Sequence, residues 1–435
     1  MNDSLLIQPL TRPVNAILTL PGSKSITNRA LLLAALAEGT SRIENALFSD
    51  DTRYMAESLQ RLGIDVRANE ADAYFEVDGT GGHIPAQEAD LFIGNAGTAA
   101  RFLTAFLTLG QGRFRLDGVP RMRARPIGDL LDALVQLGAN VHAEFDNGCP
   151  PLRIEASRLP GGTARLRADV SSQYLSALLM IAPLTPNGIE ITLDGELASR
   201  PYVDMTLRMM HDRGVRTERI GYRSFRVPGG QQYHPQLYRV EPDASAASYF
   251  FAAAAITGGR VRVEGLGLAS IQGDTAFVDI LEKMGCTVRK SPDFIEVQGP
   301  ETLRGVDVDM NAISDTVMTL AAIAPFASDP TVIRNVAHIR HKETDRLAAL
   351  AKELTRLGVE VEESPDGLAI QPMKHLRPAV IETYDDHRMA MSFAITGLRA
   401  PGIAIQNPGC VAKTLPDFFQ RLEALRETAR QGGRA

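Results

Sequence analysis

The side chains best suited to chemistry first appear in residues 21–37, PGSKSITNRALLLAALA, where two cations stand at the start of an apolar helix. Ser23 or Ser25 can cap this helix, because serine is a preferred N-cap residue, and the alanines and leucines continue it. Lys24 and Arg29 then lie in the first turns. The free N–H groups and the dipole of a helix start favour anions, so cations at this place indicate an anionic ligand. An ordinary capped helix with solvated basic side chains explains this stretch alone equally well.

The same stretch is not a nucleotide-binding P-loop. That motif needs a glycine directly before the lysine and a second glycine five positions earlier. Here Ser23 precedes Lys24, which excludes nucleotide binding of that kind.

Similar small or polar clusters open other predicted helices. They are GNAGTAAR at residues 94–101, SSQ at 171–173, Asp315, and DDHR at 385–388. Helix starts that converge on one cleft would give a strongly anion-favouring site, even in an acidic protein.

Three further segments add cations. Arg121, Arg123 and Arg125 lie in VPRMRARPIG, whose two prolines predict an ordered turn. The segment HKETDR at 341–346 is expected to open a helix with Lys342 and Arg346 on one face, although an exposed ion-paired helix start is its ordinary explanation. Lys413 follows the turn NPG at 407–409.

Two carboxylates stand out because their surroundings are small or basic residues. Asp315 and Glu343 could serve there as a base and an acid. His387 beside Arg388 is interpreted as a structural or substrate-contacting residue, because no second His or Cys has ligand spacing. We therefore expect no metal.

An internal repeat must position these residues. An amphipathic helix that ends in glycine before a Val-rich strand recurs at Gly63, Gly138, Gly214, Gly285 and Gly358, at spacings of 75, 76, 71 and 73 residues. Glycine at a helix C-cap takes the left-handed conformation at little steric cost. Short alternating runs such as YFEV at 74–77, LRIE at 152–155 and FIEV at 294–297 then predict half-buried strands.

Each of six units therefore reads as strand, helix, strand, helix, strand, strand. The sixth lacks its final strands, which residues 5–10 and 16–20 could supply from the other end of the chain. We predict an α/β protein with two three-unit domains, residues 22–240 and residues 1–21 plus 241–435, joined by a two-strand hinge around an active-site cleft. A partner-binding solenoid is the alternative, but units above 70 residues that mix strands and helices are large for one.

Composition limits the classes of function. The chain has 435 residues, 44% of them hydrophobic, and a net charge of -6, so an anion site must be a local basic cluster and a broad nucleic-acid surface is not expected. Cys149, Cys286 and Cys410 lie far apart without metal or disulfide spacing, which fits a reducing cytoplasm. No apolar stretch reaches membrane-spanning length, and we expect a cytoplasmic protein with no membrane contact.

Eight blocks along nearly the whole chain closely resemble the 5-enolpyruvylshikimate-3-phosphate synthase family. In order they are PGSKSITNRALLLAALA, IGNAGTAARFL, PRMRARPIGDLLDAL, DVSSQYLSALL, SRPYVD, RHKETDRL, YDDHRMAMSFA and CVAKTLPDF. The resemblance implies two domains of three βαβαββ units, in an enolpyruvyl transferase-like inside-out α/β barrel. It also implies transfer of the enolpyruvyl group of phosphoenolpyruvate to the 5-hydroxyl of shikimate 3-phosphate, with release of phosphate and without a cofactor.

Matching motif positions carry the family's binding residues onto this chain. For shikimate 3-phosphate they are Lys24, Ser25, Arg29, Ser171, Ser172, Gln173, Ser199, Asp315, His338 and Lys342. For phosphoenolpyruvate they are Lys24, Asn95, Gly97, Arg125, Gln173, Arg346, Arg388 and Lys413. Both substrates are phosphorylated, so arginine forks and lysine charges are the expected ligands. The resemblance further suggests that Asp315 takes the hydroxyl proton, Glu343 donates one to the methylene carbon, and Lys24 stabilises the developing charge.

Several positions depart from the commoner family pattern. His338 stands where Asn is usual, Phe102 replaces a frequent Pro and bears on tolerance to glyphosate, and Gly409 and Val411 replace Lys and Thr. The closest alternative is the enolpyruvyl transferase that acts on UDP-N-acetylglucosamine. It typically carries a reactive Cys just before the pair equivalent to Arg125-Pro126, and no Cys occurs here before Cys149. A non-catalytic anion-binding protein of the same fold is the second alternative, and we expect a monomer.

Overall fold

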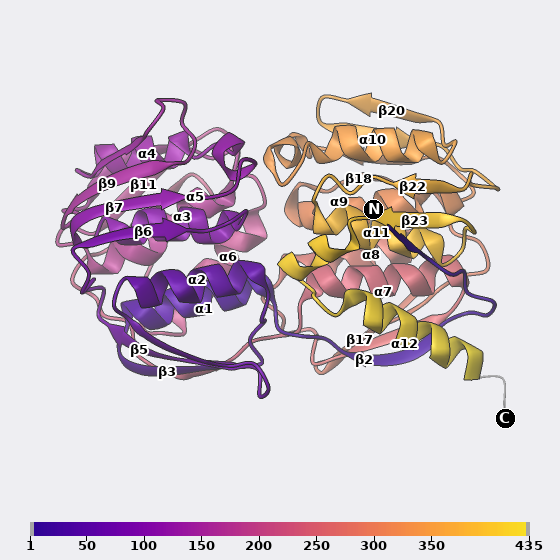
Figure 1. Ribbon diagram of the computed structural model, residues 1–435, viewed down its shortest axis with the longest axis horizontal. Coiled ribbons are helices and arrows are strands. Elements are labelled where there is room, and N and C mark those ends of the chain that lie inside the picture. Colours follow the sequence, from indigo (N-terminus) through magenta and orange to yellow (C-terminus); the bar gives the residue numbers. More distant parts are fainter. Residues whose placement is uncertain (1–3, 432–435) are drawn as a thin grey trace. The chain divides into compact units, whose positions relative to one another are not determined.

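The computed structural model describes residues 4–431 and divides the chain into two compact units (Figure 1). The contiguous unit comprises residues 22–240. The discontinuous unit comprises residues 1–21 together with 241–435. The chain passes between the units twice, at Pro21–Gly22 and at Val240–Glu241.

The contiguous unit contains three four-stranded sheets with one repeated topology. In each sheet the first strand runs parallel to the second, and the third is antiparallel to both the second and the fourth. The sheets are β14 (Leu237–Arg239), β3 (Glu38–Glu44), β5 (Tyr74–Thr80) and β4 (Asp65–Asn69); β6 (Glu88–Phe92), β7 (Gln111–Asp117), β9 (Leu152–Ser157) and β8 (Asn140–Ala143); and β10 (Gly162–Arg167), β11 (Ile189–Asp194), β13 (Ser224–Val227) and β12 (Glu218–Ile220).

The discontinuous unit repeats this topology, with one strand fewer in its last sheet. Its sheets are β2 (Asn15–Thr19), β15 (Arg260–Glu264), β17 (Phe294–Gln298) and β16 (Thr287–Lys290); β18 (Asp307–Asp309), β19 (Thr331–Arg334), β21 (Gly367–Ile370) and β20 (Val361–Ser364); and β22 (Ala379–Ile381), β23 (Ile403–Gln406) and β1 (Ser4–Leu6). The predicted six-fold repeat of βαβαββ units is therefore confirmed, including the alternating runs in β5, β9 and β17.

The prediction for the two early strands was half wrong. Strand β1 completes the sixth sheet against β23 as expected, but β2 does not join it. Instead β2 runs parallel to β15 as the first strand of the fourth unit, while β14, which precedes that unit in sequence, pairs with β3 of the first unit. The first and the fourth repeats thus exchange their first strands, since each pairs with the strand that precedes the other repeat in the sequence.

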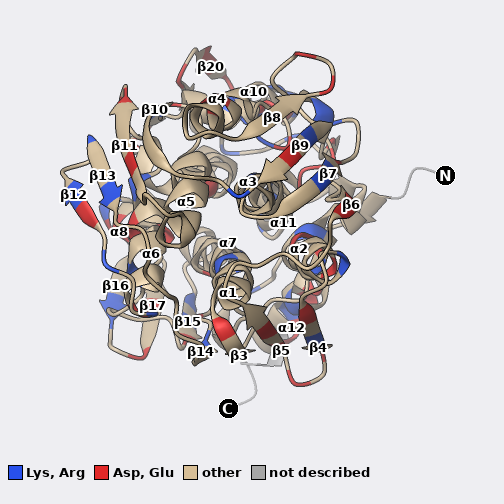
Figure 2. Cartoon of the chain, turned by 90° about the vertical axis from the view of Figure 1, so that its left-hand side faces the viewer, with Lys and Arg blue, Asp and Glu red and all other residues tan. Residues whose placement is uncertain are grey.

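Three inner helices in each unit form the core. They are α1 (Lys24–Leu36), α3 (Gly97–Leu107) and α5 (Ser172–Ile181), and α7 (Ala244–Thr257), α9 (Val317–Ile323) and α11 (His387–Gly397). Every residue of α3, α9 and α11 is buried. A helix that is apolar or small all round is expected inside a protein rather than on its surface. Figure 2 looks nearly along α1, α3 and α5, whose ribbons are mostly tan, with strands that carry charged residues around them.

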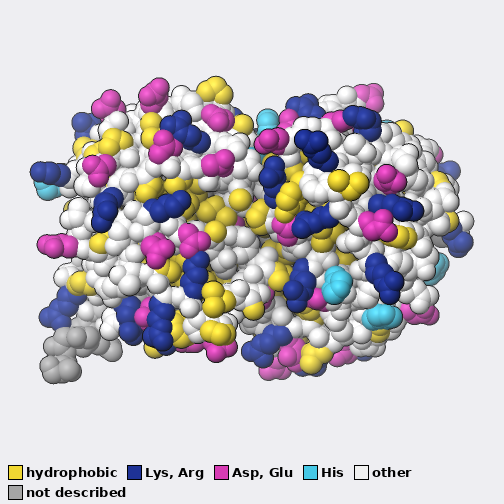
Figure 3. Space-filling view, turned by 180° about the vertical axis from the view of Figure 1, so that it is seen from behind, with side chains coloured by type: hydrophobic (Ala, Val, Ile, Leu, Met, Phe, Trp, Pro, Cys, Tyr) yellow, Lys and Arg dark blue, Asp and Glu magenta, His cyan; other side chains and the backbone are white. Residues whose placement is uncertain are grey.

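The outer helices are α2 (Asp50–Arg61), α4 (Gly128–Gln136), α6 (Arg200–His211), α8 (Phe277–Lys283), α10 (Arg346–Arg356) and α12 (Phe418–Gln431). The marker glycines follow α2, α4, α6, α8 and α10, and their φ angles lie between 86° and 103°. That left-handed conformation confirms the predicted helix C-caps. On the face shown in Figure 3, basic and acidic side chains intermingle over the surface. No described helix has the length and apolar character needed to span a bilayer.

Several predicted helix starts are correct and two are wrong. Ser171, Asp243 and Asp386 each accept a hydrogen bond from a backbone N–H in the first turn of their helix. Asp315, however, lies in the 3₁₀ turn η4 (Asn311–Thr316) ahead of α9. The segment at 341–346 also does not open a helix as predicted, because α10 begins only at Arg346, where Asp345 caps it by accepting from the Ala348 N–H at 3.1 Å. Lys342 and Arg346 are therefore not i and i+4 neighbours on one helical face.

Candidate functional site

Residues of α3, α5 and α6 surround Arg29 of α1 in the contiguous unit. The Arg29 guanidinium donates to the Thr206 hydroxyl at 2.8 Å, to the Ser176 hydroxyl at 3.4 Å and to the Tyr202 carbonyl at 3.2 Å, and it lies 5.2 Å from the ring centre of Phe102. A further bond reaches the carbonyl of residue 25. These acceptors are neutral, and burial lowers the pKa of Arg29 to about 10. A buried cation bonded to neutral oxygens leaves a positive potential for an anion to meet.

Lys24, the first residue of α1, is also mostly buried. Its Nζ lies 3.3 Å from a carboxylate oxygen of Asp51 in α2, which is 2% exposed. Sequence analysis did not single out Asp51, because one acidic residue at a helix start is ordinary. The pair fixes the position of the lysine ammonium at the start of the inner helix.

Arg125 reaches the start of α3 because Gly97 has no side chain. Its guanidinium donates to the Asn95 carbonyl at 3.0 Å and to the Asn95 side-chain oxygen at 3.1 Å. A Cβ atom on Gly97 would lie 2.4 Å from Arg125 Nη2. Gln173 at the start of α5 donates to the Thr98 hydroxyl at 3.2 Å, so the starts of α3 and α5 are joined.

The serines predicted for this unit lie at the same helix starts. Ser171 caps α5 by accepting from the Gln173 N–H at 3.3 Å, and Ser172 begins that helix. Ser199 precedes α6 in the left-handed conformation, with φ of 53°. That conformation is uncommon for a residue other than glycine and is found mostly where the surrounding structure imposes it. We call Lys24, Arg29, Asn95, Gly97, Arg125, Ser171, Ser172, Gln173 and Ser199 the contiguous-unit cluster.

The discontinuous unit gathers its charges around Arg346. The guanidinium of this residue, 1% exposed, donates to Asp386 at 2.8 Å, to Glu343 at 2.8 Å and to Asp315 at 3.3 Å. Burial lowers the pKa of Arg346, but the three carboxylates together outweigh burial and raise it. Arg346 therefore stays charged, and three acidic groups share it.

Two further cations complete this network. Arg388 at the start of α11 donates to Asp315 at 2.7 Å and to the Tyr249 hydroxyl at 3.4 Å. Lys413, in the turn η7 (Pro408–Lys413), places its Nζ 3.6 Å from Glu343. We call Asp315, Glu343, Arg346, Asp386, Arg388 and Lys413 the discontinuous-unit cluster. In this cluster Asp315 contacts Arg346 and Arg388, and Glu343 contacts Arg346 and Lys413.

His338 and Lys342 lie in and directly after the turn η6 (Ala337–His341). Burial first, and then the positive charge of Lys342, lower the pKa of His338 to about 3. His338 is therefore neutral at physiological pH and can contribute a hydrogen bond but no charge to a phosphate site.

Asp274 is a buried carboxyl that sequence analysis missed. It lies in η3 (Gly273–Ala276), accepts from the Ser245 hydroxyl, and is 5% exposed. Burial first, and then the negative charge of Asp315, raise the pKa of Asp274 to about 7. Its sequence context, QGDTAF, gives no pattern that distinguishes it from a surface turn, so only its place in the fold reveals it.

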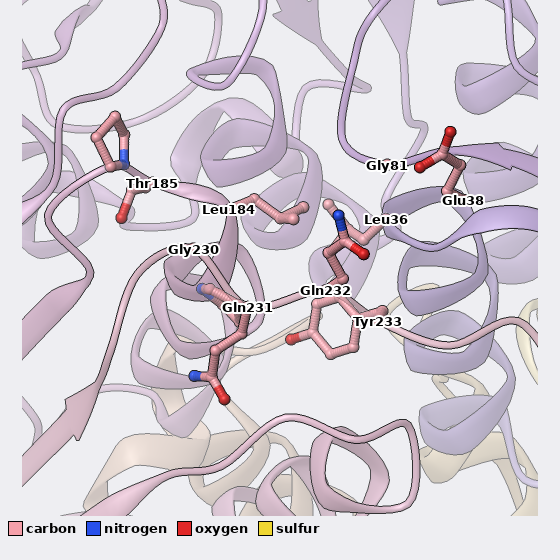
Figure 4. A pocket seen from close by; sticks show the side chains of 11 residues that line it. Leu36, Glu38, Gly81, Leu184, Thr185, Gly230, Gln231, Gln232 and Tyr233 are labelled. Carbon is pink, nitrogen blue, oxygen red and sulfur yellow. The ribbon is translucent and has the colours of Figure 1, made fainter.

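The cavities found within single units lie away from both clusters. One of about 260 Å³ in the contiguous unit has Leu36, Leu184, Gln232 and Tyr233 near its centre (Figure 4). It is lined by no lysine or arginine, and Glu38 lies at its edge, so it does not suit a phosphorylated ligand. Another, of about 730 Å³, lies at the far ends of α9 and α11 in the discontinuous unit. Within residues 4–431, no three His, Cys, Asp or Glu side chains are grouped so as to hold a metal ion.

Comparisons with known proteins agree on one family. The family model described as EPSP synthase (3-phosphoshikimate 1-carboxyvinyltransferase) matches residues 10–422. The 3-phosphoshikimate 1-carboxyvinyltransferase of Trichormus variabilis is 55% identical over 96% of this chain and 98% of its own length. That of Shewanella baltica is 50% identical over 97% and 99%. The EPSP synthase structure from Acinetobacter baumannii matches with a TM-score of 0.80 at 26% identity, covering 98% of this chain and 97% of that one.

Proposed function

The chain belongs to the EPSP synthase family, and we propose that its two clusters are the two halves of one active site in the cleft between the units. The reaction is transfer of the enolpyruvyl group of phosphoenolpyruvate to the 5-hydroxyl of shikimate 3-phosphate, with release of phosphate. The observation that carries the proposal is the gathering of cations in each unit. Lys24 and Arg388 lie at the starts of the inner helices α1 and α11, and Arg346 and Lys413 join Arg388 around Asp315 and Glu343.

Shikimate 3-phosphate is assigned mainly to the contiguous unit. Arg29 and Lys24 supply positive charge for the phosphate, and Ser171, Ser172 and Ser199 supply hydroxyl and backbone donors at helix starts. Ser25 and Gln173 complete this side. From the discontinuous unit, Asp315, His338 and Lys342 are assigned to the ring substituents, with His338 acting as a neutral partner.

Phosphoenolpyruvate is assigned to residues of both units. Its carboxylate and phosphate need several cations, which Arg125, Arg346, Arg388 and Lys413 provide together with Lys24. Asn95, Gly97 and Gln173 line the start of α3 and α5 beside Arg125. Because Arg346, Arg388 and Lys413 already contact carboxylates, the incoming substrate must compete with Asp315 and Glu343 for them.

The competition connects binding to proton transfer. Asp315 takes the proton of the 5-hydroxyl while the hydroxyl oxygen attacks C2 of phosphoenolpyruvate. Once the substrate has drawn Arg346 and Lys413 away from Glu343, this carboxylate takes a proton from water and gives it to C3. The product of this addition is a tetrahedral intermediate. Elimination then breaks the C2–O bond to phosphate, C3 returns a proton to Glu343, and the phosphate leaves with the hydroxyl proton. Lys24 stabilises the negative charge that develops as the bonds change.

The experiment is phosphate release by the purified chain with phosphoenolpyruvate and either of two acceptors. Release with shikimate 3-phosphate is the expected result. Release with UDP-N-acetylglucosamine instead would contradict shikimate 3-phosphate as the acceptor. No release with either acceptor would contradict enzymatic activity and favour a protein that only binds anions. Small-angle scattering should also show compaction when both substrates are present, because two half-sites must close to exclude water. Unchanged scattering would contradict a site shared by the two units.

We also propose that the enzyme works as a cytoplasmic monomer. All the assigned residues come from one chain, and the three cysteines, which lie within residues 4–431, are free thiols, as a reducing compartment would maintain. Light scattering during size-exclusion chromatography tests the monomer, and a dimer mass at assay concentrations would contradict it.

A further inference from the structure

Glu353 is a buried carboxylate that none of the assigned steps uses. It lies in α10 seven residues after Arg346, and its exposed fraction is 0%. Residues seven apart fall on the same face of a helix, so Glu353 lies on the side of α10 that also holds Arg346. A carboxylate is costly to bury unless it makes specific contacts.

The repeat shows that packing does not require an acid at this place. Glu353 precedes its marker glycine by five residues. The residues five before the other marker glycines are Ser58, Ala133, Met209 and Ile280. All four are buried as well, so the position belongs to the core of each unit and small or apolar residues fill it elsewhere. The fifth unit alone among these places a charge there.

The contacts of Glu353 point to one loop. Its carboxylate accepts from the Tyr384 hydroxyl at 2.7 Å and from the Glu382 N–H at 3.2 Å. The cation beside it is Arg356 at 3.1 Å, whose side chain is 41% exposed and therefore screened by water. Burial first, and then the bond to Glu353, raise the pKa of Tyr384, which keeps the phenol protonated as a donor.

The loop that Glu353 holds has an unfavourable backbone. Tyr384 and Asp385 are successive residues in the left-handed conformation, with φ of 54° and 55°. For residues other than glycine this conformation costs free energy, and it persists when surrounding contacts impose it. The Tyr384 hydroxyl donates to Glu353, the Tyr384 N–H donates to the Glu382 carboxylate at 3.2 Å, and the Asn407 side-chain amide donates to Asp385 at 3.1 Å.

The left-handed turn leads directly into the discontinuous-unit cluster. The next residue, Asp386, caps α11 by accepting from the Arg388 N–H at 2.9 Å and also accepts from Arg346 at 2.8 Å. Helix α10 therefore bonds to residues 384–386 at two points, through Arg346 at its start and through Glu353 two turns later. The bond from Tyr384 to Glu353 lies two residues before Asp386, the residue that caps α11.

We propose that Glu353 is a positioning residue for phosphoenolpyruvate. By holding the Tyr384 hydroxyl, it fixes the left-handed turn that places Asp386, Arg346 and Arg388. This inference rests on the proposed function, because it assigns those two arginines to phosphoenolpyruvate. Neither Glu353 nor Tyr384 touches the substrate in this account, and both act through Asp386.

The first test is Tyr384→Phe with Tyr233→Phe as its matched control. Each change removes one hydroxyl from a buried hydrogen bond, since the Tyr233 hydroxyl donates to the Met180 carbonyl at 2.8 Å within the contiguous unit. Both variants should lose a similar amount of thermal stability. Only Tyr384→Phe should raise the KM for phosphoenolpyruvate, by about ten-fold as expected for one lost hydrogen bond, while the Kd of shikimate 3-phosphate stays unchanged.

The second test is Glu353→Met, which places here the residue that Met209 provides in the third unit. Glu353→Met leaves the Tyr384 hydroxyl and the Glu382 N–H without their acceptor, so the melting temperature should fall by more than in Tyr384→Phe. The KM for phosphoenolpyruvate should rise at least as much as in Tyr384→Phe, and the double variant should match Glu353→Met, because Glu353→Met already removes the contact with Tyr384.

Three outcomes separate the inference from the proposed function. An inactive wild-type chain would overturn the proposed function. An active wild-type chain whose Tyr384→Phe variant has the kinetics of Tyr233→Phe would overturn the positioning role alone. Equal increases in KM for phosphoenolpyruvate and in the Kd of shikimate 3-phosphate would also overturn it, because a general loss of structure affects both substrates.

Discussion

The two units hold their most buried site arginines, Arg29 and Arg346, in opposite ways. In the contiguous unit, Arg29 is surrounded by hydroxyl and carbonyl oxygens and has a pKa lowered by burial. In the discontinuous unit, Arg346 is surrounded by three carboxylates and has a raised pKa. The first arrangement keeps its positive charge available to a substrate phosphate. The second neutralises it internally until a competing anion arrives.

This difference suggests a division of labour. An arginine without a carboxylate partner, such as Arg29, binds an anion strongly but has no acid–base group bonded to it. A site in which acids and cations alternate binds an anion less strongly, because the substrate must displace carboxylates, yet it brings acid–base groups to the reacting atoms. The contiguous unit is therefore suited to recognition and the discontinuous unit to chemistry.

The largest effect should come from Glu343→Gln, which removes the proton donor and retains the shape. We expect kcat to fall by about 10²–10⁴-fold, the usual contribution of a general acid, while the Kd of shikimate 3-phosphate changes little. Glu363→Gln is the matched control, since it removes a partly exposed carboxylate paired with Arg340 in the same unit. Unchanged turnover in Glu343→Gln would contradict proton donation by the discontinuous unit.

The second prediction compares the stability of Arg346→Met with that of Arg29→Met. Removing Arg346 leaves three carboxylates without their shared cation and should cost about 3–5 kcal/mol of unfolding free energy. Removing Arg29 should cost only about 1–2 kcal/mol, because the Thr206 hydroxyl also bonds to the Ser176 hydroxyl and the Tyr202 carbonyl.

Urea denaturation and titration with shikimate 3-phosphate measure both sides of this comparison. Arg29→Met should weaken shikimate 3-phosphate binding more than Arg346→Met does. Equal losses of stability in the two variants would mean that the clusters do not differ in the way their contacts indicate.

Much of the fold follows from short stretches of sequence. The marker glycines, the alternating runs such as residues 74–77, and the cap at Asp386 depend on local backbone preferences, and each was predicted correctly. The exchange of β2 and β14 depends on which distant strand fills a parallel edge, which no local pattern encodes. The start of α10 was misplaced because Lys342 and Arg346 have helical spacing, whereas Asp345 competes as a cap.

The site shows the same limit. Many residues of the family motifs lie in the clusters, some at helix starts, such as Lys24 and Arg388, and others in turns, such as Lys413. Asp51, Asp274 and Glu353 were missed because a single acid in a polar sequence resembles a solvated residue until burial and partners are known. Their importance comes from tertiary contacts alone.

A smaller effect is expected from Gly97→Ala in the contiguous unit. The added methyl group would meet the end of the flexible Arg125 side chain at 2.4 Å and displace it, so the KM for phosphoenolpyruvate should rise several-fold with little change in stability. Gly128→Ala is the control, because Gly128 also begins a helix and its Cβ would have no contact closer than 3.5 Å. A normal KM in Gly97→Ala would show that Arg125 does not need its place beside the start of α3.

In the wild-type chain the smallest effect is that of pH, because two buried groups of the discontinuous unit oppose each other. His338 has a pKa of about 3 when folded against 6.5 as its ordinary value, so the unfolded chain binds the extra proton and stability falls as pH decreases from about 6.5. Asp274 has a pKa of about 7 when folded against 3.8, so the folded chain binds the extra proton and its contribution is lost as pH rises through 7.

Between about pH 4 and pH 6.5 the two terms nearly cancel, and wild-type stability should change little on their account. Asp274→Asn removes one term and should expose the other as a loss of about 1.4 kcal/mol per pH unit on acidification. His338→Asn should give the opposite slope. Urea midpoints measured at intervals across this pH range test both variants. If the stability of the two variants changed with pH in the same direction, His338 would not be buried in its neutral form and Asp274 would not be buried in its protonated form.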